Sequence, residues 1–179
     1  MHYSLYQLTW LFILYSFIGW VIGTSSAALR KRKFIDVGAL FGPYCPSYGL
    51  GGVCFAVFLS ELKDQLFFLF LGGVILTFFL SVMTGLILEK IFHRKWWDYS
   101  DKRMQFGGYV RLISVLAWGA SALVCILFLN PLFTELIALI PELAGIIILF
   151  VICLTILIDL IGTISAITVV RSRIKRIIL

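Results

Sequence analysis

One acidic residue, Asp159, stands inside the long apolar stretch of residues 144 to 170. Placing an aspartate near the centre of a bilayer costs about 2.5 to 3.5 kcal/mol, so its carboxyl group must face protein and be paired, solvated or protonated. Thr155 and Thr163 lie four residues away on the same helical face and add hydroxyl groups. These residues predict a site for a substrate, water or a proton, with a hydrogen bond between helices as the alternative. Arg111 has the complementary charge, but a depth difference of roughly 10 Å at helical rise separates it from Asp159 unless the helices tilt.

A second polar group interrupts the apolar region of residues 37 to 60, where the letters GPYCPSYG run from Gly42 to Gly49. Two prolines and two glycines break any continuous helix and place two tyrosine hydroxyls and one serine hydroxyl close together. We expect a re-entrant or unwound piece at residues 37–47, followed by a helix at residues 48–62, whose N-terminus could receive an anion or a polar substrate group. The alternative is a tight cytoplasmic turn that caps the bundle. The candidate binding residues here are Gly42, Pro43, Tyr44, Pro46 and Tyr48.

A third polar group runs from Glu89 to Asp101 with the letters EKIFHRKWWDYSD. Tryptophan and tyrosine favour the membrane interface, and lysine and arginine favour an anionic cytoplasmic leaflet, which predicts a loop that anchors the chain to the membrane. Alternatively, Glu89, Asp98 and Asp101 form an ion-paired cytoplasmic gate with the neighbouring cations. The residues singled out here are Glu89, Trp97, Asp98 and Tyr99.

The residue pattern gives little support to metal or enzyme chemistry. The four cysteines stand far apart and the two histidines do not group with them, so we expect no metal site and no other cofactor. Histidine clusters, paired aspartates and Ser/Lys arrangements are also missing from the sequence, which disfavours an intramembrane enzyme acting on lipid-linked material. We therefore predict that the chain is not an enzyme.

The elements that must position these residues are membrane helices. With 179 residues, 61% hydrophobic residues, 13% charged residues and a mean hydropathy of +1.06, the chain has more apolar surface than a soluble domain of this size can bury. The net charge of +6 sits in short clusters beside apolar runs, so we expect lipid as the partner and no nucleic acid. We predict an all-α, polytopic bundle in one transmembrane domain, residues 1–179. Its expected spans are residues 5–29 (a retained span rather than a signal peptide), 48–62, 66–88, 109–129 and 144–170.

The positions of the basic residues predict how the bundle is oriented. Fourteen of the fifteen lysines and arginines flank three alternate junctions, and only Lys63 lies on the other side. Because basic residues mark the cytoplasmic side, we expect five spans with the N-terminus outside and the C-terminus cytoplasmic. Residues 131–141, with two prolines, are too short to span and are expected to be interfacial or re-entrant. Gly19, Gly23 and Ala27 recur at four-residue spacing and predict a close helix contact.

The order of these features resembles the CmpB-like ABC-transporter permease family of small bacterial membrane proteins. The resemblance covers residues 15 to 119 and rests on an ordered set of short motifs: Phe17-Ile18-Gly19-Trp20, Gly38 with Gly42-Pro43, Pro46-Ser47-Tyr48-Gly49, Thr84-Gly85 with Leu88-Glu89, Trp97-Asp98-Tyr99-Ser100, and Ser114 with Trp118-Gly119. The chain departs from the family at Gly23 and Ser81, where glutamates are usual, and at Gly107-Gly108, where a Gly-Arg pair is usual. The resemblance implies a divergent member with a transport role.

These observations favour a membrane transport component, either permease-like or a substrate-binding subunit, that moves or binds a small solute. The sequence has no Gly-Lys-Ser/Thr phosphate loop, so we expect dependence on a separate ATPase subunit or an ion gradient. The alternative is a structural or regulatory subunit or a small channel, in which the chain forms a homo-oligomer. The full set of candidate binding or gating residues is Trp20, Gly42, Pro43, Tyr44, Pro46, Tyr48, Glu89, Trp97, Asp98, Tyr99, Arg111, Trp118 and Asp159.

Overall fold

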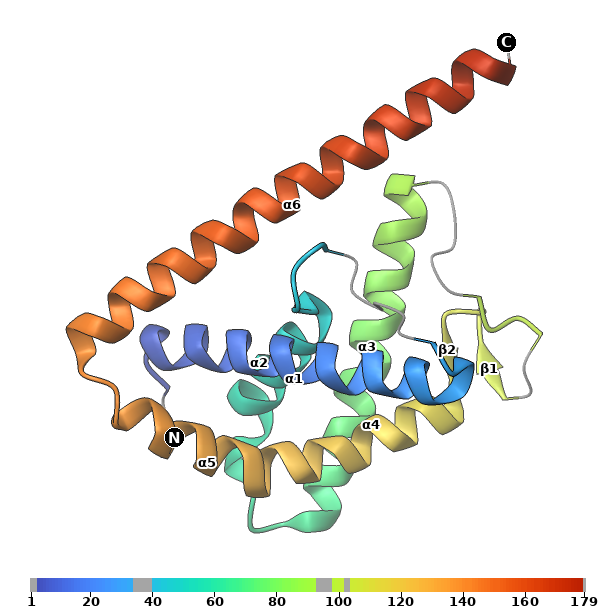
Figure 1. The fold of residues 1–179 in the computed structure, drawn as a ribbon. Coiled ribbons are helices and arrows are strands. Elements are labelled where there is room, and N and C mark those ends of the chain that lie inside the picture. Colours follow the sequence, from blue (N-terminus) through green and yellow to red (C-terminus); the bar gives the residue numbers. More distant parts are fainter. Residues whose placement is uncertain (1–2, 34–39, 93–97, 102–103, 179) are drawn as a thin grey trace. The chain divides into compact units, whose positions relative to one another are not determined.

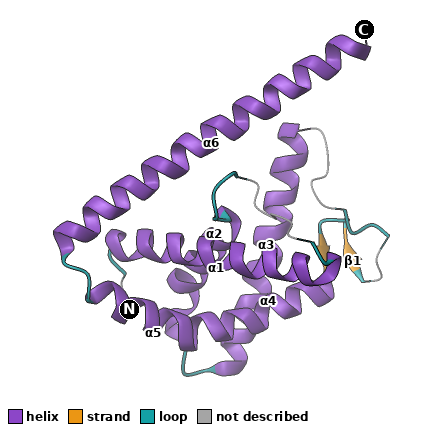
Figure 2. Ribbon diagram, in the orientation of Figure 1, coloured by secondary structure: helices purple, strands orange, loops and turns teal. Residues whose placement is uncertain are grey.

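The computed structural model describes residues 3–33, 40–92, 98–101 and 104–178 and is helical almost throughout (Figures 1 and 2). Its elements, in chain order, are α1 (Leu5–Lys31), α2 (Pro46–Leu59), the 3₁₀ turn η1 (Ser60–Leu62), α3 (Leu66–Phe92), the strands β1 (Gln105–Phe106) and β2 (Val110–Arg111), α4 (Leu112–Val124), the π-helical segment η2 (Cys125–Leu129), α5 (Asn130–Ala138) and α6 (Glu142–Ile178). The strands pair antiparallel, with Gln105 opposite Arg111 and Phe106 opposite Val110. The predicted all-α polytopic class is confirmed.

Four helical stretches in the described part of the chain are long and apolar enough to cross a membrane. They cover Leu5–Leu29, Leu66–Ile87, Leu112–Ala138 and Glu142–Ser165. The remaining apolar helix, Pro46–Leu62, is shorter and at helical rise extends only about 25 Å, against roughly 30 Å of hydrocarbon. The fifth crossing therefore stays a prediction. Helix α2 begins at Pro46 rather than at residue 48, because proline is well suited to the first turn of a helix, where no N–H is needed.

The helix that contains the predicted span 109–129 does not end at residue 129, and the expectation that residues 131–141 are interfacial or re-entrant stays a prediction. The helix that begins at Leu112 continues through η2 and α5 to Ala138. In the wide π turn, the Asn130 N–H donates to the Cys125 carbonyl, five residues back. Pro131 has no N–H and crowds the preceding turn of a regular α-helix, so the widened turn lets the helix continue past it.

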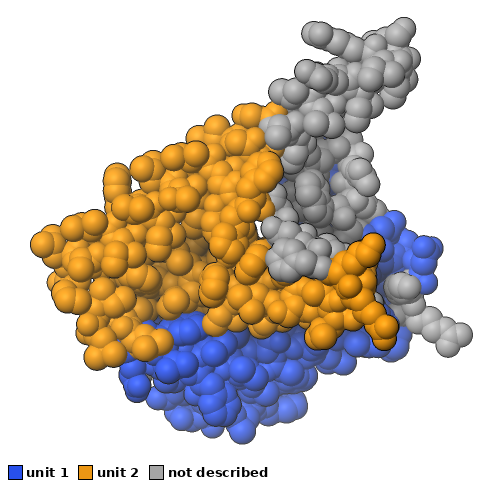
Figure 3. Space-filling model, in the orientation of Figure 1, with its two compact units in different colours: residues 1–3, 51–135 blue, residues 4–50, 136–179 orange. Residues whose placement is uncertain are grey.

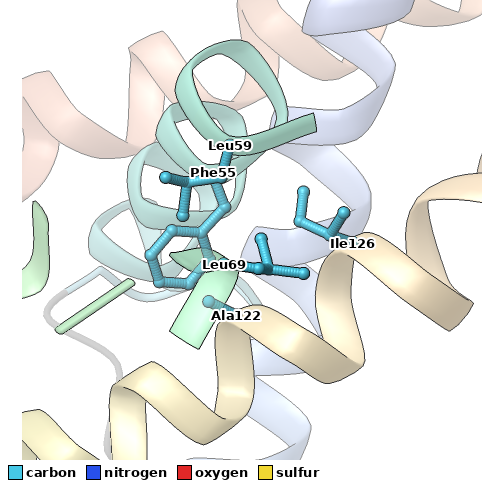
Figure 4. Packing of buried hydrophobic residues seen from close by; sticks show 5 residues of the cluster. All are labelled: Phe55, Leu59, Leu69, Ala122 and Ile126. Atoms are coloured by element: carbon cyan, nitrogen blue, oxygen red, sulfur yellow. The ribbon is translucent and has the colours of Figure 1, made fainter. Parts of the chain in front are cut away.

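The chain divides into two compact units, coloured separately in Figure 3. One unit contains residues 1–3 and 51–135, and its core is formed by Phe55, Leu59, Leu69, Ala122 and Ile126 (Figure 4). Helices α3 and α4 approach closely in this unit: a Cβ atom added at Gly73 would lie only 2.6 Å from the Cβ of Ala122, so the contact requires glycine at this position.

The other unit contains residues 4–50 and 136–179, and therefore α1, the first turn of α2, and α6. Helix α1 begins with a capping box, in which the Ser4 hydroxyl accepts from the Gln7 N–H and the Gln7 side chain accepts from the Ser4 N–H. Within this unit the small-residue face of α1 receives a side chain: a Cβ atom at Gly19 would lie 2.7 Å from Cδ1 of Tyr48. The close contact expected at Gly19 is therefore present. The expectation of a single transmembrane domain stays a prediction.

Candidate functional site

The carboxylate of Asp159, on α6, accepts four hydrogen bonds from its own unit. Its donors are the Phe41 N–H at 3.1 Å, the Gly42 N–H at 2.8 Å, the Tyr44 hydroxyl, and the Thr163 hydroxyl at 3.4 Å. We call these five residues the Asp159 latch. Three of the four donors belong to the segment between α1 and α2, so the latch joins the broken segment to an apolar helix.

The segment that supplies these donors folds as its sequence requires. A Cβ atom at Gly42 would lie 2.6 Å from the Tyr44 hydroxyl oxygen, so only glycine leaves room for the tyrosine ring to fold back over the turn. The Tyr44 N–H donates to the Gly42 carbonyl at 2.8 Å, and the Cys45 N–H donates to the Ser16 carbonyl on α1 at 2.9 Å. These bonds hold the Phe41 and Gly42 amides in a position where one carboxylate can accept from both.

The latch supplies the Asp159 carboxylate with hydrogen-bond donors, which the hydrocarbon of a membrane lacks. Successive backbone N–H groups form a concave anion-binding arrangement, and hydrogen bonds to an ionised acceptor are stronger than neutral ones. Their combined effect offsets the cost of holding the charge of Asp159 within an apolar helix. The Tyr44 hydroxyl donates to the carboxylate, so it keeps its proton while this hydrogen bond is formed.

One expectation about these residues needs correction. Thr155 was expected to add its hydroxyl beside Asp159, but that hydroxyl donates to the Val151 carbonyl at 2.8 Å within its own helix. The expectation that the N-terminus of α2 receives an anion or a polar substrate group stays a prediction; its Tyr48 and Gly49 amides donate to the Cys45 carbonyl. The donors that meet a carboxylate belong instead to the loop before the helix. The predicted helix-to-helix bond of Asp159 is in fact a bond between helix and loop.

A second polar group lies in the other unit, around the hairpin formed by residues 104–111. The Tyr109 hydroxyl donates to the Glu89 carboxylate on α3, and a Cβ atom at Gly85 would lie 2.7 Å from the Tyr109 ring. The Tyr99 N–H donates to the Gly108 carbonyl at 2.9 Å, which ties the segment of residues 98–101 to the hairpin. The hydrogen bond to Glu89 is the main cause that raises the pKa of Tyr109.

The structure therefore brings Glu89 and Tyr99 to one hairpin, which the sequence predicted only as a shared loop. Asp98 accepts from the Ser100 N–H at 2.9 Å and from the Ser100 hydroxyl at 2.5 Å, so it stabilises a local turn. Trp97 lies outside the described residues, as do the cations at positions 94, 95, 102 and 103. The ion-paired gate therefore stays a prediction.

The remaining candidates lie at packing positions. Trp118 packs against the core of its unit, and Trp20 stacks with Phe17 at a ring distance of 6.3 Å. Tyr48 packs on Gly19, and Pro46 begins α2. Pro43 lies between the two latch residues Gly42 and Tyr44, whereas Arg111 forms the end of β2 and the N-cap of α4.

Sequence reasoning missed Tyr109 and the backbone amide of Phe41. The Gly107-Gly108 pair, with φ values of 60° and 78°, is a typical hairpin turn and was the signal that could have placed Tyr109 opposite α3. No side-chain pattern marks the Phe41 amide, because any residue carries one. Among the residues that the structure describes, no three His, Cys, Asp or Glu side chains gather closely enough to hold a metal ion.

Comparison with protein families identifies the family of this chain. The family model described as "Putative ABC-transporter type IV" matches residues 10–164, which is most of the chain. The resemblance predicted from the ordered motifs is thereby confirmed and extends beyond residue 119. Comparison with curated proteins and with solved structures finds no significant match.

Proposed function

Because the chain belongs to the family described as "Putative ABC-transporter type IV", we propose that it is the membrane subunit of a transporter that binds or moves a small polar solute, with the Asp159 latch as its moving part. Membership makes it a transport-related membrane component. The solute, the partner and the mechanism are our proposal. The observation that carries it is the carboxylate inside an apolar helix that is held by an irregular backbone segment.

The mechanism we propose is an exchange of donors at Asp159. If the loop leaves, the carboxylate loses the Phe41, Gly42 and Tyr44 donors, and an uncompensated charge at membrane depth is costly. A solute with hydrogen-bond donors of its own, such as an ammonium or hydroxyl compound, or a cation, replaces them. Binding of the solute is then coupled to release of the loop. In many transporters the substrate site is likewise formed by interrupted helices within the membrane.

The energy for such a cycle has to come from elsewhere. The sequence has no phosphate-binding loop, so we propose a separate ATPase subunit, or an ion gradient acting through Asp159. The clusters of basic residues support an orientation with the N-terminus outside and the C-terminus in the cytoplasm, where an ATPase subunit would bind. We place the protein in a bacterial cytoplasmic membrane.

A second candidate is a structural or regulatory subunit, in which the latch only locks the loop. It is favoured by the fact that the carboxylate already has four donors from the chain itself. The two candidate functions predict different effects of Tyr44→Phe on the apparent affinity for the solute. Where loop release precedes solute binding, a weaker latch increases the apparent affinity for the solute, because more of the protein is competent to bind. A structural lock predicts only a loss of stability.

The test begins with purification of the tagged chain together with ATPase subunits encoded beside it, followed by reconstitution into liposomes. We expect an ATPase to co-purify and its hydrolysis rate to depend on the chain, and Asp159→Asn to lower that dependence while membrane insertion is retained. Asp64→Asn, an exposed carboxylate change in the other unit, is the matched control. The proposal fails if no ATPase binds and liposomes with the chain alone carry no proton or sodium flux above protein-free liposomes.

A further inference from the structure

A cavity of about 440 Å³ lies between α3, the hairpin of residues 104–111 and the start of α4, all within one unit. Its walls include Ile75 and Phe79 from α3, Met104 and Phe106 from the hairpin, and Leu112 and Val115 from α4. The volume falls within the range of roughly 300 to 1,000 Å³ that is typical of sites for small ligands. None of the contacts described above for the Asp159 latch involves this cavity.

The walls of the cavity are almost entirely apolar. Gln105 is the one polar residue among the described residues that line it, and the side-chain oxygen of Gln105 already accepts from the Gly108 N–H at 2.6 Å. A water molecule needs two to four polar partners to be held in a cavity, and these walls do not supply them. The chemistry of the cavity therefore favours a hydrocarbon occupant.

The cavity also lies where hydrocarbon chains are available. The ring of Phe106 packs against Phe78 on α3 at a centroid distance of 5.5 Å. Phe78 is nine residues before Ile87, the end of the apolar stretch, and therefore roughly 13 Å along the helix from that end. Met104, Phe106 and Phe79 remain 69%, 65% and 62% exposed, so the cavity opens towards the surroundings of an apolar helix rather than into a closed core.

Arg111 supplies a charge next to these walls. It lies between Val110 and Leu112, both of which line the cavity, and it ends the strand that leads into α4. Its Nε atom is buried and has no hydrogen-bond partner among the described residues. Because the Nε atom is shielded, a phosphate would be bound by the terminal N–H groups of this guanidinium, which can donate several hydrogen bonds at once.

We propose that this cavity holds one acyl chain of an anionic phospholipid, with the lipid phosphate bound by Arg111. Transfer of an acyl chain from the bilayer into an apolar pocket gains little hydrophobic free energy, because lipid tails are as apolar as the walls. Preference for this lipid must therefore come from close packing in the cavity and from the charge of Arg111. The proposal is independent of the Asp159 latch and of the identity of any transported solute.

Native mass spectrometry of the protein in mild detergent, after incubation with equal amounts of phosphatidylglycerol and phosphatidylcholine, tests the proposal. We expect the protein to retain one phosphatidylglycerol, and Ile75→Trp to lose it by filling the cavity. Leu71→Trp is the matched control, because Leu71 lies one turn earlier on α3, is 40% exposed against 49% for Ile75, and does not line the cavity. This control variant should retain the lipid.

Arg111 variants test the head-group contact separately. Arg111→Gln should reduce the preference for phosphatidylglycerol over phosphatidylcholine by about tenfold, as expected for loss of a charge-assisted hydrogen bond, whereas Arg111→Lys should keep part of it. The proposal is overturned if both tryptophan variants retain lipid equally, or if the protein retains both lipids without preference. It is also overturned if Ile75→Trp changes the oligomeric state, since the cavity would then be covered by a second copy of the chain.

Discussion

Removing the Tyr44 hydroxyl weakens the Asp159 latch without changing any formal charge. In the Tyr44→Phe variant the ring still fits over Gly42, and the carboxylate keeps its bonds from the Phe41 and Gly42 amides. The change therefore removes one donor of the latch and leaves the course of the backbone intact. We expect the loop to leave Asp159 more often.

The size of the effect follows from the type of bond. A hydrogen bond to a charged group contributes about 1.5 to 3 kcal/mol, and each 1.4 kcal/mol is a factor of about ten in an equilibrium. Tyr44 is only half-buried, so solvent weakens the bond and the lower end of that range applies. We therefore expect the population of the released loop to rise about tenfold.

Cys45 provides the assay, because it follows Tyr44 directly and its thiol is free and half-buried. The backbone N–H of Cys45 donates to the Ser16 carbonyl on α1. In a protein whose other three cysteines are replaced by alanine, the rate of Cys45 alkylation by a membrane-permeant maleimide reports release of the loop. Tyr44→Phe should increase that rate about tenfold. The matched control is Tyr109→Phe, which also removes a hydroxyl bound to a carboxylate, but in the other unit.

The control should leave the alkylation rate of Cys45 unchanged. An equal rate in Tyr44→Phe and in the parent protein would show that the hydroxyl does not hold the loop, and the latch would then rest on the backbone amides alone. Equal increases in both tyrosine variants would show that alkylation reports general loosening of the protein rather than release of this loop.

Three further predictions concern single contacts. Asp159→Asn should accelerate thiol alkylation more than loss of the tyrosine hydroxyl, because the amide has only one oxygen to accept from two loop N–H groups; alkylation no faster than in the parent protein would contradict this. Gly49→Ala places a Cβ atom 2.6 Å from a carbonyl oxygen of α1 and should destabilise the protein by about 1 to 3 kcal/mol in thermal unfolding, whereas Gly51→Ala, with nothing within 4 Å, should gain about 0.5 to 1 kcal/mol. Hydrogen bonding to Glu89 raises the pKa of Tyr109 above the ordinary tyrosine value of 10.0. The stability that this hydrogen bond contributes is therefore fully present below pH 10 and is lost as the pH rises through the pKa of the folded protein. Tyr109→Phe should lack this loss of stability at alkaline pH, as measured by unfolding across pH.

Much of the fold could be predicted from the sequence, because hydropathy and proline positions act locally. The long apolar runs mark the helices, and Pro46 correctly marks the end of the irregular segment to within two residues. The continuation of the helix to Ala138 could not be predicted from local rules, since Pro131 normally ends a helix and the π turn that accommodates it has no sequence signature.

The importance of Asp159 could also be predicted from the sequence, but its partners could not. A charge inside an apolar run requires compensation, and that requirement is visible in the sequence. Three of the four donors are more than a hundred residues away, and two of these are backbone amides, which no residue type identifies. Thr155 and Thr163 were equivalent by spacing, yet only Thr163 donates to the carboxylate.

The π-helical turn at Cys125–Leu129 is the position where the helix from Leu112 to Ala138 is expected to bend most easily. Helices bend most easily where the hydrogen-bond ladder is interrupted, and Pro131 ensures that the ladder cannot be repaired by a small shift of the chain. Bending of this helix during a transport cycle would therefore be concentrated in one turn, and the segments on either side of it would move as rigid bodies. Replacing Pro131 with alanine would supply the missing backbone N–H and favour a regular, straight helix.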